Sequence, residues 1–140
     1  CDKGIKTYQT RFPRDFKVNL HTLSMQKRSS NQSTEKLKEK ESQALLAEIK
    51  PNTKIITLDV TGKMLDTPQL AHKIQTIKDE AMHIAFLIGG PDGMSNICLE
   101  KADFVWSLSK LTLPHPMVRL ILFEQLYRSW SIINHHPYHK

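Results

Sequence analysis

The chain has 140 residues, a length typical of one domain that can bury its own core. Hydrophobic residues make up 39% of it and charged residues 24%, which excludes a wholly disordered protein. No apolar run approaches the roughly 18 residues that a membrane-spanning helix needs, so a transmembrane protein is excluded. The two cysteines, Cys1 and Cys98, are too few for a disulfide framework or a zinc site, and they favour a reducing, cytoplasmic setting.

Positive charge is concentrated at the start of the chain. Lysine and arginine number 20 against 14 acidic residues, a formal net charge of +6. Residues 1–28 hold seven basic and two acidic residues, so they carry a net charge of +5. A basic segment on a balanced body is typical of a protein that meets a phosphate-rich partner such as nucleic acid. The alternative is a solvated surface with a mild lysine bias, and charge alone does not choose between them.

The first fifty residues predict a helix, a strand, a loop and a second helix. Residues 4–12 read as the end of a helix, because the proline that follows disfavours helical geometry in the residue before it. Residues 16–23 alternate apolar and polar side chains, the pattern of a half-buried strand. Residues 26–34 contain no apolar side chain and predict a mobile loop. A helix is expected over about 35–50, with only its later, more apolar turns docked.

The middle of the chain predicts a strand, a turn and a helix. Residues 54–60 are rich in β-branched side chains and indicate a buried strand. Residues 61–63, which contain a glycine, predict a turn that ends this strand. Asp66 or Thr67 is expected to cap a helix that carries proline in its first turn and runs to about Glu80.

The last third predicts two more strands and two more helices. The strands are expected over 84–88 and 104–108, and the helices over 96–101 and 116–134. A glycine-rich turn at 89–93 separates the first strand from the helix that follows it. Cys98 falls in the shorter helix and is expected to be a small core residue.

The alternation of strands with helices predicts the fold class. The central strands are continuously apolar, which favours an α/β domain with a largely parallel sheet covered by helices on both faces. Ligands in such folds bind at the carboxyl ends of the strands. The segments that follow Asp59, Ile88 and Leu108 are therefore the candidate binding loops.

Two of these segments suit a ligand. The turn at 89–93 holds three of the five glycines, which allow close backbone approach to a ligand; a plain tight turn explains them equally well. It lacks the dinucleotide-binding and P-loop spacings. The segment 106–116 is unusually apolar for a loop. It either walls a pocket for an adenine or a thioether, or lies buried under the last helix.

The last helix and the tail complete the candidate features. The helix is apolar on more than one face, which indicates burial on several sides and most simply a symmetric dimer. Arg119 and Arg128 interrupt it, and each either pairs with a carboxylate or clamps a phosphate or cofactor carboxylate. The tail HHPYHK at 135–140 lacks the cysteine or carboxylate partners of a metal site. It is either a frayed terminus or a polar tail that folds over a site.

These segments together resemble one family. The resemblance is carried by six blocks in order: KIITLDVTGK, TPQLA, LIGGPDG, SLSKLTLPHPMVR, EQLYRSWSI and NHHPYHK. They are similar to the bacterial ribosomal RNA large-subunit pseudouridine N3-methyltransferases of the SPOUT superfamily. The resemblance implies an α/β fold with a C-terminal trefoil knot, bound S-adenosylmethionine and an obligate homodimer. Family members begin with a further strand, so we expect a single methyltransferase domain over residues 1–140 that lacks it, in a chain that starts late or was processed.

The resemblance also implies roles for particular residues. The cofactor pocket would be lined by Leu58, Gly89, Leu108, Ser109, Lys110, Leu111, Thr112 and Leu113. The residues near the methyl group and the target base would be Arg128, Tyr138, His139 and His115. The tail of one subunit would complete the site of the other. Ribosomal RNA would be contacted by Arg11, Arg14, Lys27, Arg28 and Lys140.

The expected function is therefore methylation of N3 of a pseudouridine in 23S ribosomal RNA, on assembled ribosomes in the cytoplasm. No metal is expected, because the cofactor's sulfonium already activates the methyl group. Two alternatives stay open. A non-catalytic RNA- or nucleotide-binding module explains the charge and the glycines but not the apolar loop. The second is a SPOUT-like methyltransferase for another RNA, such as transfer RNA.

Overall fold

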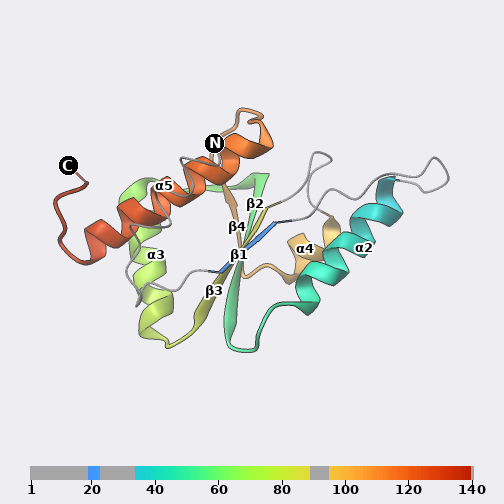
Figure 1. The fold of residues 1–140 in the computed structure, drawn as a ribbon, viewed down its shortest axis with the longest axis horizontal. Coiled ribbons are helices and arrows are strands. Elements are labelled where there is room, and N and C mark those ends of the chain that lie inside the picture. The colour runs from blue at the N-terminus through green and yellow to red at the C-terminus, as the bar shows by residue number, and fades with distance from the viewer. Residues whose placement is uncertain (1–18, 23–33, 89–94, 140) are drawn as a thin grey trace.

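A four-stranded sheet lies between two pairs of helices in the computed structural model, which describes residues 19–22, 34–88 and 95–139 (Figure 1). The strands are β1 (Asn19–Thr22), β2 (Thr53–Met64), β3 (His83–Ile88) and β4 (Phe104–Ser107). The helices are α2 (Thr34–Ala47), α3 (Thr67–Asp79), α4 (Asn96–Lys101) and α5 (His115–Ile133). The strand order is β1-β3-β2-β4 and every described pair is parallel. Helices α3 and α5 cover one face and α2 and α4 the other, so the predicted α/β architecture is confirmed.

Helix α3 shows how local sequence sets an element. Asp66 caps it by accepting a hydrogen bond from the Gln69 backbone N–H at 2.8 Å, and the Gln69 side chain accepts one from the Asp66 N–H at 2.8 Å. This reciprocal pair satisfies two donors that the first turn would otherwise leave open. The helical period puts Leu70, Ile74 and Ile77 on one face, and all three side chains are buried. The predicted cap and span are confirmed.

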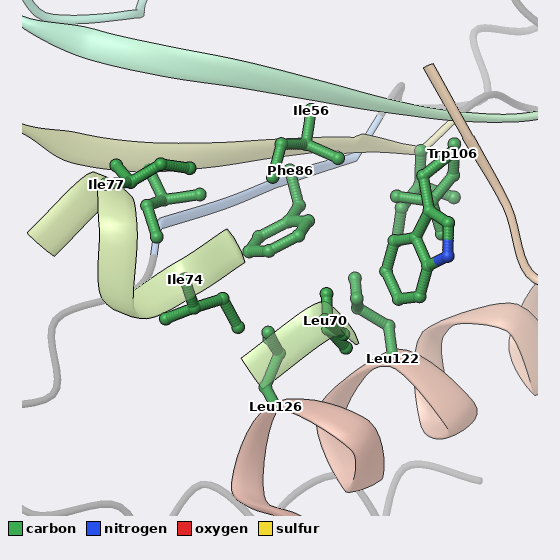
Figure 2. Close-up of a cluster of buried hydrophobic side chains, with 11 residues drawn as sticks. Ile56, Leu70, Ile74, Ile77, Phe86, Trp106, Leu122 and Leu126 are labelled. Atoms are coloured by element: carbon green, nitrogen blue, oxygen red, sulfur yellow. The ribbon is translucent and has the colours of Figure 1, made fainter. Parts of the chain in front are cut away.

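The main core lies between the sheet and helices α3 and α5. Its members are the buried side chains Ile56, Leu58, Leu70, Ile74, Ile77, Ile84, Phe86, Ile88, Trp106, Leu122 and Leu126. Phe86 projects from the sheet toward both helices (Figure 2). The Phe86 and Trp106 rings lie 6.3 Å apart at 59°, within the range of favourable aromatic pairs. This core fixes α5 against α3, which places the C-terminal end of α5 relative to the sheet.

The opposite face of the sheet carries a smaller core under α2 and α4. Leu45, Leu87 and Cys98 form it, so the prediction that Cys98 is a core residue is confirmed. The Ser95 hydroxyl donates to the Ser42 hydroxyl at 2.5 Å and joins the two helices. The first turns of α2 carry exposed charged residues, while Ser42 and Leu45 are buried, as expected for a helix that docks by its later turns.

The predicted turn at residues 61–63 is wrong. Strand β2 continues to Met64, and the pairing with β4 shifts between Leu58 and Lys63, which both lie opposite Trp106. The extra residues form a bulge, in which the Asp59 carboxylate accepts hydrogen bonds from the backbone N–H and the hydroxyl of Thr61. The glycine therefore marks a close approach of two strands inside the sheet and does not end the strand.

The remaining boundaries differ by a few residues. Helix α2 ends at Ala47, three residues before the predicted end, and Asn52 takes a left-handed conformation with φ 58° before β2 begins. Helix α4 matches its predicted span, 96–101. Of the predicted strand at 16–23 the structure describes β1. The predicted helix at 4–12, residues 26–33 of the loop predicted at 26–34, and the glycine turn at 89–93 lie outside the described residues, while Thr34 begins α2.

Replacing Gly62 with alanine is expected to destabilise the domain. A Cβ at this position would lie 2.6 Å from the carbonyl carbon and oxygen of Val105, which are backbone atoms that cannot rotate away. The strands would have to separate, at a cost of about 1–3 kcal/mol. Urea denaturation at fixed protein concentration measures the loss. The exposed neighbour Lys63→Ala is the control and should leave the midpoint unchanged; an unchanged midpoint for Gly62→Ala would contradict the close approach.

Candidate active site

The carboxyl ends of β3 and β4 flank β2 at Leu58, just before the bulge through which β2 continues to Met64. The binding loop predicted after Asp59 is therefore wrong, because these residues belong to the strand. Leu58 of β2 lies opposite Ile88 of β3 on one side and opposite Trp106 of β4 on the other. Leu58 is buried, with 8% of its surface exposed. Gly89, which follows Ile88 in the sequence, lies outside the described residues. The register thus brings together the strand ends before the predicted binding loops.

The loop that follows β4 is shaped by two serines. The Ser107 hydroxyl donates to the Ser109 carbonyl at 2.8 Å, and the Ser109 hydroxyl accepts from the Leu111 backbone N–H at 3.0 Å. Backbone groups from Lys110 to Leu113 make no backbone–backbone hydrogen bond within the described residues. Leu111 is 71% exposed. The loop thus offers apolar side chains beside backbone donors and acceptors.

This combination fits S-adenosylmethionine. An adenine ring needs apolar walls for its faces and N–H and C=O partners for its edge, and the loop at 108–113 carries both. Leu58 adds a buried apolar side chain from the neighbouring strand end. The alternative, a loop buried beneath the last helix, does not hold for Lys110, Leu111 and Thr112, which are exposed.

The tail packs against the end of α5. The ring of Tyr127 lies 4.7 Å from that of Tyr138 and 6.5 Å from that of His136, each edge-on. The rings of Trp130 and His136 lie 5.3 Å apart. These contacts fold the tail back along the helix, so the interpretation as a frayed terminus is wrong for residues 135–139.

This packing brings Arg128, Tyr138 and His139 together around Glu124. The Arg128 guanidinium donates through Nε and Nη2 to Glu124 Oε1, at 2.8 and 2.7 Å. The Tyr138 hydroxyl donates to the same oxygen at 3.3 Å. The guanidinium lies 4.9 Å from the Tyr138 ring centroid, and its Nη1 lies 3.2 Å from His139 Nδ1. Arg128 therefore pairs with a carboxylate, as one of its two interpretations expected. It also contacts Tyr138 and His139, the tail residues that the family resemblance grouped with it.

His115 is not part of this cluster. It begins α5, thirteen positions before Arg128, so the two backbones stand about 20 Å apart along the helix axis. The loop at 108–113 precedes the same end of the helix. Within one chain, the loop at 108–113 thus adjoins the N-terminal end of α5, whereas Arg128, Tyr138 and His139 gather along its C-terminal half. The predicted RNA contacts Arg11, Arg14, Lys27, Arg28 and Lys140 lie outside the described residues.

Sequence reasoning missed Glu124 and Gln125. The Gln125 amide donates to Glu124 Oε2 at 2.7 Å, and its oxygen accepts from the Thr67 hydroxyl of α3 at 2.7 Å. The spacing of four between Glu124 and Arg128 is the signal that could have found the pair. Nothing in the sequence indicates the link to Thr67, because it depends on how α3 packs on α5.

Two buried donors near the start of α5 have no hydrogen-bond partner among the described residues. They are Trp106 Nε1 and Arg119 Nε, so Arg119 has no carboxylate partner at that nitrogen. The described part of the chain contains no group of three or more side chains placed to hold a metal ion. It also contains no helix long and apolar enough to cross a membrane.

Comparison with known proteins places the chain in a family. The model of a family described as "Predicted SPOUT methyltransferase" matches residues 1–139, and the chain belongs to this family. A relative from Coxiella burnetii (strain Dugway 5J108-111) is 47% identical over 137 residues, which cover 98% of this chain and 88% of that protein. That relative is named "Ribosomal RNA large subunit methyltransferase H".

Proposed function

We propose that this chain is an S-adenosylmethionine-dependent methyltransferase that modifies N3 of a pseudouridine in 23S ribosomal RNA, on assembled ribosomes in the cytoplasm. The observation that carries the proposal is the cluster of Arg128, Tyr138 and His139 around Glu124, in a SPOUT family fold. The relative's name supports ribosomal RNA as the substrate class. Residues 1–140 would form one methyltransferase domain, and the family implies the trefoil knot, whose path includes residues outside the described ranges.

In this reaction N3 forms a bond to the methyl carbon, the carbon–sulfur bond breaks with its electron pair left on sulfur, and the N3 proton leaves the base. The chain's residues hold the reactants in line and exclude water. Leu58 and the loop at 108–113 would bind the cofactor. Arg128 would face the negative charge that develops on the base or hold a neighbouring phosphate, because its guanidinium stays charged. Tyr138 and His139 would position the base.

A homodimer would bring together the cofactor loop and the tail, which lie apart along α5 within one chain. Loop 108–113 and the tail stand too far apart in one chain to act on the same methyl group. The tail of one subunit would therefore complete the site formed by the loop of its partner. Exposed apolar side chains at the loop, the β2 bulge and the start of α5 support such an interface; they are Val60, Met64, Leu111 and Met117.

The substrate contacts would come from basic residues outside the described ranges. Arg11, Arg14, Lys27, Arg28 and Lys140 would meet the phosphate backbone, an attraction that weakens steeply with salt. A dimer of so small a chain would have little surface with which to read a base sequence. Recognition would therefore depend on the preformed shape of the ribosome, which separates this proposal from one with transfer RNA as substrate.

Alanine replacement of Tyr138 or His139 tests the assignment of the tail. Both variants are expected to bind S-adenosylmethionine with the wild-type affinity, because the tail is proposed to meet the target base whereas the loop at 108–113 is proposed to hold the cofactor. Their methyl transfer to ribosomes should fall by about a hundredfold or more, the usual cost of losing a transition-state contact. Calorimetry measures the affinity and transfer of labelled methyl groups measures the rate. Full turnover by both variants would contradict the assignment.

A further inference from the structure

The contact between Arg128 and His139 fixes where the imidazole carries its proton. Arg128 Nη1 lies 3.2 Å from His139 Nδ1. A guanidinium has only donors and keeps its charge, so Nδ1 can meet it only as an acceptor, through its lone pair. A neutral imidazole with an unprotonated Nδ1 carries its hydrogen on Nε2. Among the described residues Nε2 has no hydrogen-bond partner, so its N–H is available to a ligand.

Glu124 determines the position of the guanidinium. Its Oε1 accepts from Nε and Nη2 of Arg128, which leaves Nη1 directed at the imidazole. Its Oε2 accepts from Gln125, which in turn accepts from Thr67 at the start of α3. The carboxylate is thus held by the packing of two helices. Side chains of Glu124 and Arg128 are 20% and 29% exposed, so the pair is only partly solvated.

We propose that Glu124 is a positioning residue which, through Arg128, holds His139 as a hydrogen-bond donor at Nε2 and so excludes it as the base that removes the N3 proton. This inference rests on the proposed function. The donated bond would go to a ring carbonyl oxygen of the pyrimidine, where charge collects once N3 is deprotonated. The N3 proton passes to solvent water before the reactants are closed off from it, and His139 does not act as the proton acceptor.

Two replacements of His139 separate a donor from a base. Glutamine places an amide N–H near the position of Nε2 and cannot take up a proton, whereas asparagine places its amide near Nδ1. We expect His139→Gln to transfer methyl groups at least about tenfold faster than His139→Ala, and His139→Asn to be as slow as the alanine variant. His72→Gln, an exposed histidine on α3, is the matched control. A glutamine variant as slow as the alanine variant would overturn the donor role.

The imidazole nitrogens give a readout that does not need methyl transfer. In protein labelled with nitrogen-15 at histidine, His139 should show an unprotonated Nδ1 and a protonated Nε2 in the absence of cofactor and RNA. Glu124→Ala should change the Nδ1 signal and slow transfer as much as His139→Ala, with unchanged cofactor affinity. Glu124→Gln keeps an acceptor for Arg128 and should recover part of both.

The rates of methyl transfer and the nitrogen-15 signals of His139 distinguish this inference from the proposed function. A protonated Nδ1 in the wild-type protein would overturn the inference even if methyl transfer occurs. A correct tautomer that Glu124→Ala leaves unchanged would overturn the positioning role of Glu124. Absence of methyl transfer from a protein with the expected tautomer would contradict the proposed function and leave the arrangement of the three side chains intact. Residues that act as a unit lose their effect on the rate together when one of them is replaced. The Glu124→Ala/His139→Ala double variant should therefore transfer methyl groups no more slowly than either single variant.

Discussion

Two inactive variants are expected to form an active enzyme when they share a dimer. Leu113→Asp places a charge in the loop proposed to hold the cofactor, and Arg128→Ala removes the centre of the tail cluster. Each homodimer should be inactive. A heterodimer built from one chain of each kind keeps one site in which an intact loop meets an intact tail. It should have about half of the wild-type activity per dimer, because one of two symmetric sites survives.

The physical reason is the length of α5. The loop adjoins the N-terminal end of this helix and the tail contacts its C-terminal half, and about 20 Å of helix separates His115 from Arg128. Coexpression with two different tags and tandem purification isolates the heterodimer, and transfer of labelled methyl groups measures its activity. The control heterodimer joins Leu113→Asp to the double variant Leu113→Asp/Arg128→Ala and should stay inactive. An inactive test heterodimer that still binds cofactor at its intact loop would contradict a site shared between subunits.

Leu126→Ala is expected to cause the largest loss of stability. Leu126 is fully buried in the core that joins α5 to α3 and the sheet (Figure 2). Truncation removes apolar contacts and leaves a cavity, at a cost of about 2–5 kcal/mol. Because Leu126 lies between Glu124 and Arg128 on the same helix, loosening this turn should also lower methyl transfer in the fraction that stays folded.

Urea denaturation at a fixed protomer concentration measures the stability effect, since dimerisation makes the midpoint depend on concentration. Ile132→Ala, on the same helix but only half-buried, is the control and should cost clearly less. Equal losses for the two variants would contradict the packing of α5 on α3.

Patterns that depend on neighbours in the sequence predicted most of the fold. The cap of α3, the buried face at Leu70, Ile74 and Ile77, and the parallel order of apolar strands all follow from local residue types and their period. The turn predicted at residues 61–63 failed for a non-local reason. Gly62 is required by the backbone of Val105, more than forty residues away, and its presence in a strand could be read only from the pairing with β4.

Part of the candidate site could also be predicted from the sequence, and part of it could not. Strand-end reasoning pointed to the loop that follows Leu108, because the carboxyl ends of parallel strands share an edge. Leu58 was proposed from the family resemblance. The grouping of Arg128 with Tyr138 and His139 came only from the family resemblance. The sequence could not identify Glu124 as their common partner, since the tail must first fold back through the Tyr127 and Tyr138 rings.

Mapping the methyl group on ribosomes tests the central claim most directly. The purified protein would be incubated with labelled S-adenosylmethionine and with large ribosomal subunits, protein-free 23S RNA or bulk transfer RNA, and the RNA digested to nucleosides for mass spectrometry. We expect a methyl group on N3 of pseudouridine from the ribosomal subunits, with little transfer to the other two RNAs. Methylation of transfer RNA instead, or no transfer by a folded, cofactor-binding dimer, would contradict it.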